Sequence, residues 1–275
     1  MRSDITFGQY IEGDSLFHRF DARIKIITSI LFIVTIFLAK SLTAFALIFV
    51  SITVFVIMTR IPVRMMIKAM KPLLFIIIFT ALINILWFKG DTLLVQFWII
   101  SIYLEGIFNA GIIIFRIIVL IIATSVFLTY TTTPLALTDA LESLLKPLKL
   151  IHVPVHEFAM MMTIALRFIP TLIDETRKII NAQTARGADF SSGGLIKRAK
   201  AMIPILIPLF VSAFRRADEL AVAMECRCYT GGEGRTKMNV PKTDAKDWIF
   251  FGVIILIGAA VVLLNIFLPV YTFSI

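Results

Sequence analysis

The fold class is decided by residues 107–129, which read IFNAGIIIFRIIVLIIATSVFLT and contain a single charged side chain, that of Arg116. A helix needs roughly 17–25 mostly apolar residues to cross the hydrocarbon core of a bilayer. This stretch is long enough and apolar enough to do so. The sequence therefore predicts a membrane protein, and further stretches of the same kind lie on both sides of this one.

Four more candidate spans lie at 24–39, 41–59, 72–88 and 248–268. The first is the shortest, and we expect Arg23 and Lys25 to snorkel toward the lipid headgroups so that it can cross. Between the third and fourth spans, the apolar run 93–104 is too short to cross. We expect it to lie at the outer interface of the membrane.

The distribution of basic residues orients these five spans. With the N-terminus inside, the inner segments are 1–25, 60–71 and 130–247, and they hold 24 of the 27 Lys and Arg residues. Loops on the cytoplasmic side of a membrane carry this excess. The sequence therefore predicts a multi-pass protein of the cell (inner or plasma) membrane with a cytoplasmic N-terminus and an outside C-terminus.

Composition excludes other classes. The chain is 59% hydrophobic and only 16% charged, whereas a soluble domain carries about a quarter charged residues. The net charge of +9 is explained by cytoplasmic loops that face anionic lipid, and no nucleic-acid motif accompanies it. Residues 1–22 are too polar for a cleavable signal peptide, because they contain four acidic side chains.

Three helices are predicted within residues 130–247. The first covers 135–150, the second 155–186 and the third 195–228. The second is apolar at first and is interrupted by Arg167 and Pro170, and the third has an apolar middle broken by Pro204 and Pro208. Amphipathic helices of this kind are expected at the inner membrane interface. The predicted fold is an all-α polytopic membrane protein of about five transmembrane helices plus long amphipathic cytoplasmic helices.

Three regions follow from these assignments. They are an N-terminal arm with four spans (1–129), a cytoplasmic helical region (130–247) and a C-terminal span (248–275). Within the second region, the consecutive methionines Met160, Met161 and Met162 suit a surface that adapts to different partners. Filling of an internal core is the other interpretation of these methionines.

The second and third predicted helices end alike. One closes with Ala185-Arg186-Gly187 and the other with Cys226-Arg227-Cys228. An arginine in the last turn of a helix is favoured by the helix dipole, which accounts for either residue alone. Two exposed ends, each with a planar guanidinium of five donors, would also form a two-point docking device.

Other constellations predict little chemistry. His152 and His156 have the spacing of metal ligands on a helix, but Pro154 lies between them and no third ligand is near in sequence. Cys226 and Cys228 have one intervening residue where a metal or redox pair would have two. The loop at 231–236, GGEGRT, lacks the phosphate-loop pattern. We therefore predict that this chain binds no cofactor or metal, and that a partner binds any ATP consumed.

The spans themselves carry no catalytic constellation. Arg116 and Asn84 are the exceptional polar groups within them. An intramembrane arginine is a candidate functional residue, and both helix packing and contact with a lipid headgroup are open for Arg116. No nucleophile motif or zinc-protease motif occurs, so the chain is predicted not to be an enzyme.

Long stretches of the chain resemble a known family. They are YIEGDSLFHRFDAR at 10–23, AQTARGADF at 182–190, PLFVSAFRRADELAVAME at 208–225 and GGEGRT at 231–236. On these stretches the sequence is similar to the transmembrane T component (EcfT) of energy-coupling factor (ECF) transporters, the importers of vitamins and some transition metals.

The resemblance implies a scaffold within an ABC transporter complex. In that family the cytoplasmic helices are coupling helices, and Ala-Arg-Gly-like motifs at their ends dock into two ATPase subunits, of the EcfA and EcfA' type. By resemblance, Arg186 and Arg227 are those arginines. The second motif differs in having cysteines around its arginine, and glycine tolerates backbone conformations that cysteine does not.

The resemblance also implies a separate S component that binds the vitamin or other micronutrient. The candidate contact residues on this chain are Met160, Met161, Met162, Pro204 and Pro208. ATPase motion would then reach the S component through the coupling helices and drive vitamin uptake. The alternatives are a conventional permease with its own substrate pathway, which calls for polar residues along the spans, and a membrane-embedded enzyme, which lacks catalytic residues here.

Overall fold

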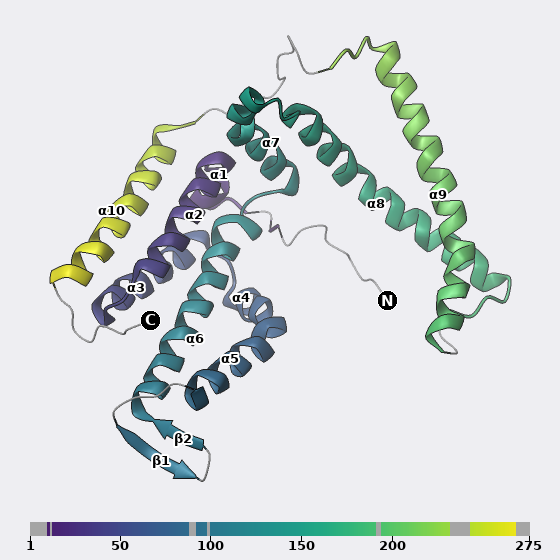
Figure 1. The fold of residues 1–275 in the computed structure, drawn as a ribbon. Helices are drawn as coiled ribbons and strands as arrows, with labels where there is room; N and C mark the ends of the chain where they lie inside the picture. Colours follow the sequence, from purple (N-terminus) through teal and green to yellow (C-terminus); the bar gives the residue numbers. More distant parts are fainter. Residues whose placement is uncertain are drawn as a thin grey trace. The chain divides into compact units, whose positions relative to one another are not determined.

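The computed structural model describes residues 10–11, 13–87, 92–97, 100–190, 194–231 and 243–267. The GGEGRT loop lies almost wholly outside these residues. The helices are α1 (Leu16–Arg19), α2 (Ala22–Leu38), α3 (Leu42–Thr59), α4 (Val63–Met70), α5 (Leu74–Trp87), α6 (Leu104–Thr124), α7 (Pro134–Leu145), α8 (Val155–Ala185), α9 (Leu195–Cys226) and α10 (Ala245–Phe267) (Figure 1).

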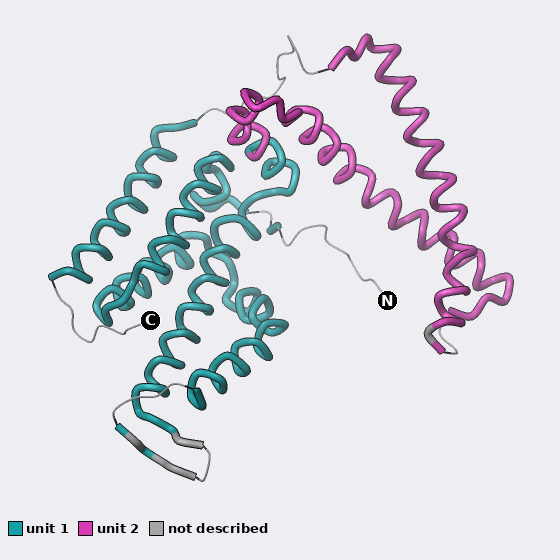
Figure 2. Tube along the Cα trace, viewed as in Figure 1, with its two compact units in different colours: residues 1–140, 241–275 teal, residues 141–240 magenta. Residues whose placement is uncertain are grey.

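Short non-α segments complete the helical elements. They are the 3₁₀ turn η1 (Lys71–Leu73), the π-helical segment η2 (Ser125–Thr129) and the 3₁₀ turns of η3 (Lys146–Ile151). The chain forms two compact units (Figure 2): unit 1 is residues 1–140 and 241–275, and unit 2 is residues 141–240. The predicted regions, 1–129, 130–247 and 248–275, do not share these boundaries.

Unit 1 is built around a cluster of aromatic rings. In it α2 packs against both α10 and α6, and α3 packs against α10. Phe17 is 1% exposed, and its ring centroid lies 5.1 Å from that of Phe250, 5.8 Å from Phe55 and 5.9 Å from Phe127. Buried aromatic rings contribute large apolar areas and favourable edge-to-face contacts. Because these rings come from four elements far apart in sequence, the cluster holds the N-terminal arm, α3, η2 and α10 together.

The predicted spans form helices. Among the described residues, five helical segments are long and apolar enough to cross a membrane, namely Leu42–Thr59, Val63–Trp87, Leu104–Thr129, Val155–Ala185 and Ala245–Phe267. Four of them confirm the spans predicted from 41, 72, 107 and 248. The remaining predicted span, 24–39, forms α2. This helix has 17 residues, one fewer than α3, which is the shortest of the five segments. The segment Val155–Ala185 is α8, for which the sequence predicted an interfacial position.

The all-α prediction misses one small feature. Two short strands, β1 (Leu93–Phe97) and β2 (Ile100–Tyr103), pair in antiparallel fashion, with Leu93 opposite Tyr103 and Phe97 opposite Ile100. The segment is rich in aliphatic and aromatic residues, which favour strands. Pairing the strands satisfies backbone groups that a chain segment too short to span the membrane would otherwise leave without partners. Glu105 accepts hydrogen bonds from the Thr92 backbone and hydroxyl, at 3.1 and 2.6 Å, and so closes the base of the hairpin.

Unit 2 consists of the end of α7, η3 and the long helices α8 and α9. The predicted bounds of α8 and α9 agree with the structure to within two residues. The prolines interrupt the apolar stretches without ending the helices, because α8 runs through Pro170 and α9 runs through Pro204 and Pro208. Proline removes one helical hydrogen bond and bends the axis, but its fixed φ is itself helical. Each is therefore one continuous helix of more than thirty residues.

Candidate docking site at two helix ends

The end of α8 is a glycine cap. Ala185 is the last helical residue, and Gly187 has a φ of +88°. The Gly187 N–H donates to the Thr184 carbonyl at 2.9 Å, and the Ala188 N–H donates to the Gln183 carbonyl at 3.0 Å. This pair of bonds is the Schellman motif, which terminates a helix through a residue in the left-handed conformation. Arg186 therefore lies at a sharply defined, solvent-exposed end.

The end of α9 has the same backbone geometry without glycine. The Cys228 N–H donates to the Glu225 carbonyl at 2.8 Å, and the Tyr229 N–H donates to the Met224 carbonyl at 3.0 Å. Cys228 has a φ of +55°, a conformation that costs an ordinary residue roughly 1–2 kcal/mol. The cysteine therefore occupies the backbone position that Gly187 occupies on α8, and Arg227 takes the place of Arg186.

Both guanidinium groups are available to a partner. Ala185, Arg186, Gly187, Cys226, Arg227 and Cys228 are all exposed. Within the described part of the chain, neither Arg186 nor Arg227 forms an ion pair. An exposed guanidinium with its donors unused is suited to bidentate hydrogen bonds with carboxylates or backbone carbonyls of another protein.

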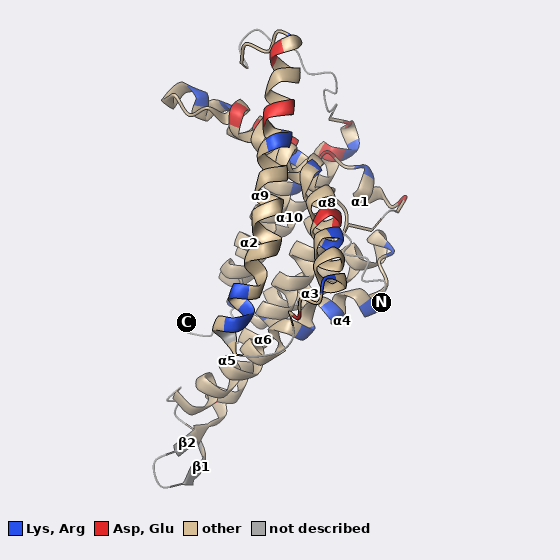
Figure 3. Ribbon diagram, turned by 90° about the vertical axis from the view of Figure 1, so that its right-hand side faces the viewer, with Lys and Arg blue, Asp and Glu red and all other residues tan. Residues whose placement is uncertain are grey.

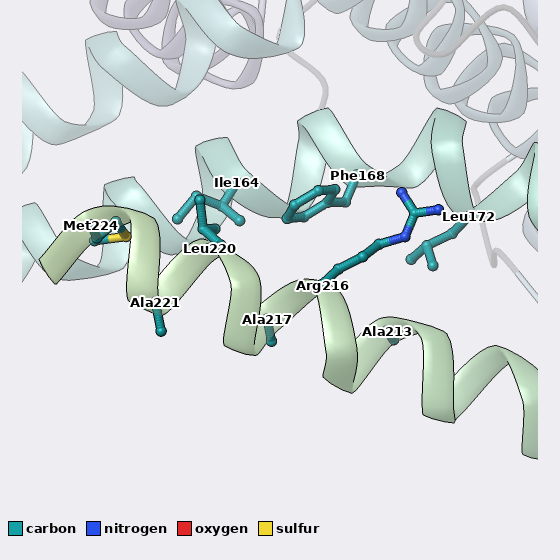
Figure 4. Close-up of a pocket in the computed structure, with 9 residues that line it drawn as sticks. All are labelled: Ile164, Phe168, Leu172, Ala213, Arg216, Ala217, Leu220, Ala221 and Met224. Carbon is teal, nitrogen blue, oxygen red and sulfur yellow. The ribbon is translucent and has the colours of Figure 1, made fainter. Parts of the chain in front are cut away.

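The two helices pack side by side in opposite directions. Figure 4 shows Leu220 and Met224 of α9 near Ile164 of α8, and Arg216 of α9 near Leu172, which is farther along α8. A partly open groove of about 260 Å³ lies between them, lined mainly by apolar side chains. One ion pair crosses the interface, from Arg216 Nη2 to Glu175 Oε2 at 2.8 Å. The antiparallel arrangement puts Arg186 and Arg227 toward opposite ends of the pair.

The predicted S-component residues are separated by the same arrangement. Met160, Met161 and Met162 lie near the start of α8, and Pro204 and Pro208 lie near the start of α9. Met161 and Met162 are exposed, as are both prolines, whereas Met160 is half-buried. Because the helices are antiparallel, the two groups lie toward opposite ends of the pair and do not form one continuous patch.

Charge on α9 is segregated along the helix. Figure 3 shows basic residues at its start, an almost uncharged middle and charges of both signs toward its end. The start carries Lys197, Arg198 and Lys200, all exposed, and the exposed apolar middle includes Ile207 and Phe210. Such a helix is suited to an interface between water and an apolar phase or partner.

Other residues singled out from the sequence have structural partners. His156 Nδ1 lies 3.0 Å from Glu142 Oε1, and among the described residues no three His, Cys, Asp or Glu side chains gather as a metal site. Arg116 Nη2 donates to the Ala39 carbonyl at 3.1 Å, and the guanidinium lies over the ring of Phe45. Of the two roles left open for Arg116, the structure has the helix-packing one.

The sequence analysis missed a buried polar cluster in unit 1. The prediction that Lys25 snorkels toward lipid headgroups is wrong, because Lys25 is 2% exposed and its ammonium donates to the Thr131 carbonyl at 2.9 Å. A buried ammonium is tolerated only where protein groups replace its water. Asp21 and Asp247 lie in the same region. Their positions at the starts of α2 and α10 match the preference for aspartate at helix N-termini. This preference is the sequence signal by which the two aspartates could have been found.

These observations define a class, a multi-pass membrane protein that presents two long, exposed helices with matching arginine ends. A family model described as CbiQ, cobalt transport protein, matches residues 13–238. A relative from Ruminiclostridium cellulolyticum is 52% identical and covers 96% of this chain and 98% of its own. A Bacillus subtilis relative is 47% identical over 90% and 93%, and one from Lactococcus lactis is 46% identical over 94% and 97%.

Each of these relatives is named energy-coupling factor transporter transmembrane protein EcfT. The chain therefore belongs to the CbiQ family and, within it, to the EcfT transmembrane proteins of energy-coupling factor transporters. It is a non-catalytic membrane component of a transporter, and the resemblance deduced from the sequence is confirmed.

Proposed function

We propose that this chain is the scaffold that passes motion from two ATPase subunits to a substrate-binding S component in an importer of vitamins or other micronutrients. The single observation that carries this proposal is the repetition of one backbone cap, with one exposed arginine, at the ends of α8 and α9. Two ends with the same backbone cap, at opposite ends of the helix pair, suit two ATPase subunits of one kind of fold.

The helices themselves suit force transmission. Each is a single element of more than thirty residues, and the Arg216–Glu175 pair and the apolar contacts join them at their crossing. A displacement of one arginine end therefore moves the whole helix and tilts its partner. An S component that contacts the exposed Met161, Met162, Pro204 and Pro208 would be displaced by this tilt. ATP is used by the ATPases, and this chain holds no cofactor.

The proposed orientation has the N-terminus and unit 2 in the cytoplasm and the C-terminus outside. Within unit 1, the Tyr130 hydroxyl donates to the Met65 carbonyl at 3.1 Å, so the basic helix α4 lies at the same end as Lys25. The opposite end, at the α2–α3 hairpin, carries Lys40 beside Asn265. The charge asymmetry between these two ends agrees with the excess of basic residues on the cytoplasmic side.

The test reverses the charge at both ends. We expect Arg186→Glu combined with Arg227→Glu to abolish co-purification of the ATPases and substrate uptake, because two docking contacts are replaced by repulsion. The matched control is Arg215→Glu, an exposed arginine of α9 away from both caps, which should keep both activities. Unchanged ATPase binding in the double variant would refute the docking assignment. Substrate binding and transport by the purified chain alone would favour a conventional permease instead.

A further inference from the structure

The chain passes between its two units at two places. It leaves unit 1 after Ala140 and returns to it at Pro241. The segment before the first passage, Tyr130–Thr132, and the segment after the second, Asp244–Asp247, both belong to unit 1. Each of these segments is held by the same short stretch near the N-terminus, residues 11–25, which forms the entry into α2.

The outgoing segment is held by Lys25 and Ile11. The Lys25 ammonium donates to the Thr131 carbonyl at 2.9 Å and lies 3.4 Å from the Thr132 hydroxyl. The Ile11 N–H donates to the Tyr130 carbonyl at 3.1 Å. These three consecutive residues directly follow the π-helical segment η2 and precede α7. The backbone that leads toward unit 2 is therefore fixed at two successive carbonyls.

The returning segment is held by Asp247. Its carboxylate is 2% exposed, and it accepts the Asp21 N–H at Oδ1, 3.0 Å away, and the Asp244 N–H at Oδ2, 2.8 Å away. Asp21 in turn caps α2 by accepting the Arg23 N–H at 2.9 Å. The start of α10 is thus bound to the start of α2, one turn away from Lys25.

This cluster buries charged side chains inside unit 1. An ammonium at Lys25 and a carboxylate at Asp247 are each 2% exposed, and burial of either alone is costly. Buried charges of this kind are often no more stabilising than apolar side chains of similar size, and in some proteins they specify position instead. This cluster fixes Tyr130–Thr132, which precede α7, and the start of α10.

We propose that Lys25 and Asp247 are positioning residues that fix the segment before α7 and the start of α10 to the start of α2, so that movement of α8 and α9 is passed on to unit 1. We call this pair of residues and its hydrogen bonds the latch, and the proposal rests on the proposed coupling function. Without the latch, unit 2 would still bind the ATPases, but less of its motion would reach unit 1.

The first test measures substrate imported per ATP hydrolysed, in proteoliposomes with the purified whole complex. Lys25→Met removes the ammonium at similar length, and Asp247→Asn keeps the shape and one acceptor. We expect both complexes to assemble and hydrolyse ATP as wild type does. Import per ATP should fall roughly fivefold or more, the usual scale of coupling between sites.

The matched control is Asn265→Ala at the opposite end of unit 1. Asn265 also makes three backbone contacts, accepting the Lys40 and Ser41 N–H groups at 3.2 and 3.1 Å and donating to the Leu38 carbonyl at 2.8 Å. It ties α10 to the α2–α3 hairpin but touches neither connection. The ratio should stay at the wild-type value in this variant even if its thermal stability falls, which separates positioning from simple structural support.

A second readout does not depend on transport. Spin labels at Lys68→Cys in unit 1 and Lys178→Cys in unit 2, both exposed positions, are placed in a Cys226→Ser, Cys228→Ser chain. We expect the label-to-label distance distribution to broaden in Lys25→Met and to keep its width in Asn265→Ala. Should Lys25→Met fail to assemble, Asp247→Asn decides both readouts.

The outcomes separate the two proposals. If the wild-type chain recruits no ATPase, the coupling function itself is wrong. Suppose instead that the wild-type chain recruits the ATPases. If Lys25→Met and Asp247→Asn then keep the wild-type ratio of import to ATP hydrolysis and the wild-type width of the distance distribution, the latch is overturned while the coupling function stands. An equal loss of ratio in Asn265→Ala also overturns the latch, because any weakening of unit 1 would then suffice.

Discussion

The two helix caps make a paired prediction about valine substitutions. Gly187 and Cys228 both have positive φ, at +88° and +55°, and close the same two backbone bonds. A β-branched residue in the left-handed region is a conformational outlier. Gly187→Val and Cys228→Val should therefore both open their caps, whereas Cys228→Gly should strengthen the cap of α9.

The magnitude follows from the space around Gly187. A Cβ built at this position meets no atom within 4 Å, so the cost of a side chain is conformational and not steric. That cost is roughly 1–2 kcal/mol for an ordinary residue, and about 1.4 kcal/mol corresponds to a tenfold change in an equilibrium constant. If an ATPase binds only the capped end, its apparent affinity falls in proportion to the capped fraction, hence by up to about tenfold, the full amount being reached where the open end predominates. Cys228→Gly should recover up to about the same amount.

The assay is titration of each purified ATPase subunit onto the full chain in nanodiscs, followed by biolayer interferometry. The control is Gly194→Val, the same substitution in the same unit, also with no atom within 4 Å of its Cβ. Its φ of −69° suits valine, and binding should be unchanged. Wild-type affinity in both Gly187→Val and Cys228→Val would refute the reasoning that the caps shape the docking ends.

Two further outcomes follow from unit 1 and from the cysteines. Phe17→Ala should lower the free energy of unfolding by roughly 3–5 kcal/mol, which the midpoint of SDS-induced unfolding measures. Phe75 is 76% exposed on α5, so Phe75→Ala should change this midpoint little. Equal shifts in the two variants would contradict a central role for the aromatic cluster. Cys226 and Cys228, the two cysteines of the chain and both exposed, should react with an impermeant maleimide in inside-out vesicles and not in right-side-out ones. Labelling with the opposite preference would reverse the proposed orientation.

The parts of the fold that the sequence predicts are those governed by local signals. The spans that form α3, α5, α6 and α10 were predicted because runs of apolar residues of this length have few other uses. The ends of α8 and α9 were predicted to within two residues, since glycine-containing stops and polar turns act over a few positions. The two arginine ends were noted for the same reason, as both lie beside such a stop.

The parts that could not be predicted depend on contacts between distant residues. Lys25 turns inward because the Thr131 carbonyl, over a hundred residues later, is placed beside it. The Phe17 cluster likewise assembles from four separate elements. The left-handed conformation of Cys228 contradicts the preference of its own side chain, and it is explained by the two carbonyls, of Glu225 and Met224, that the Cys228 and Tyr229 N–H groups satisfy. No periodicity or composition in one segment encodes these arrangements.

The central claim, that each arginine end docks one ATPase subunit, is tested most directly by the mass of the detergent-purified complex in the absence of ATP. Native mass spectrometry should find two ATPase subunits per wild-type chain, one per chain in Arg186→Glu and in Arg227→Glu alone, and none in the double variant. The subunit lost should differ between the two single variants. Retention of two ATPase subunits by the double variant would contradict the account.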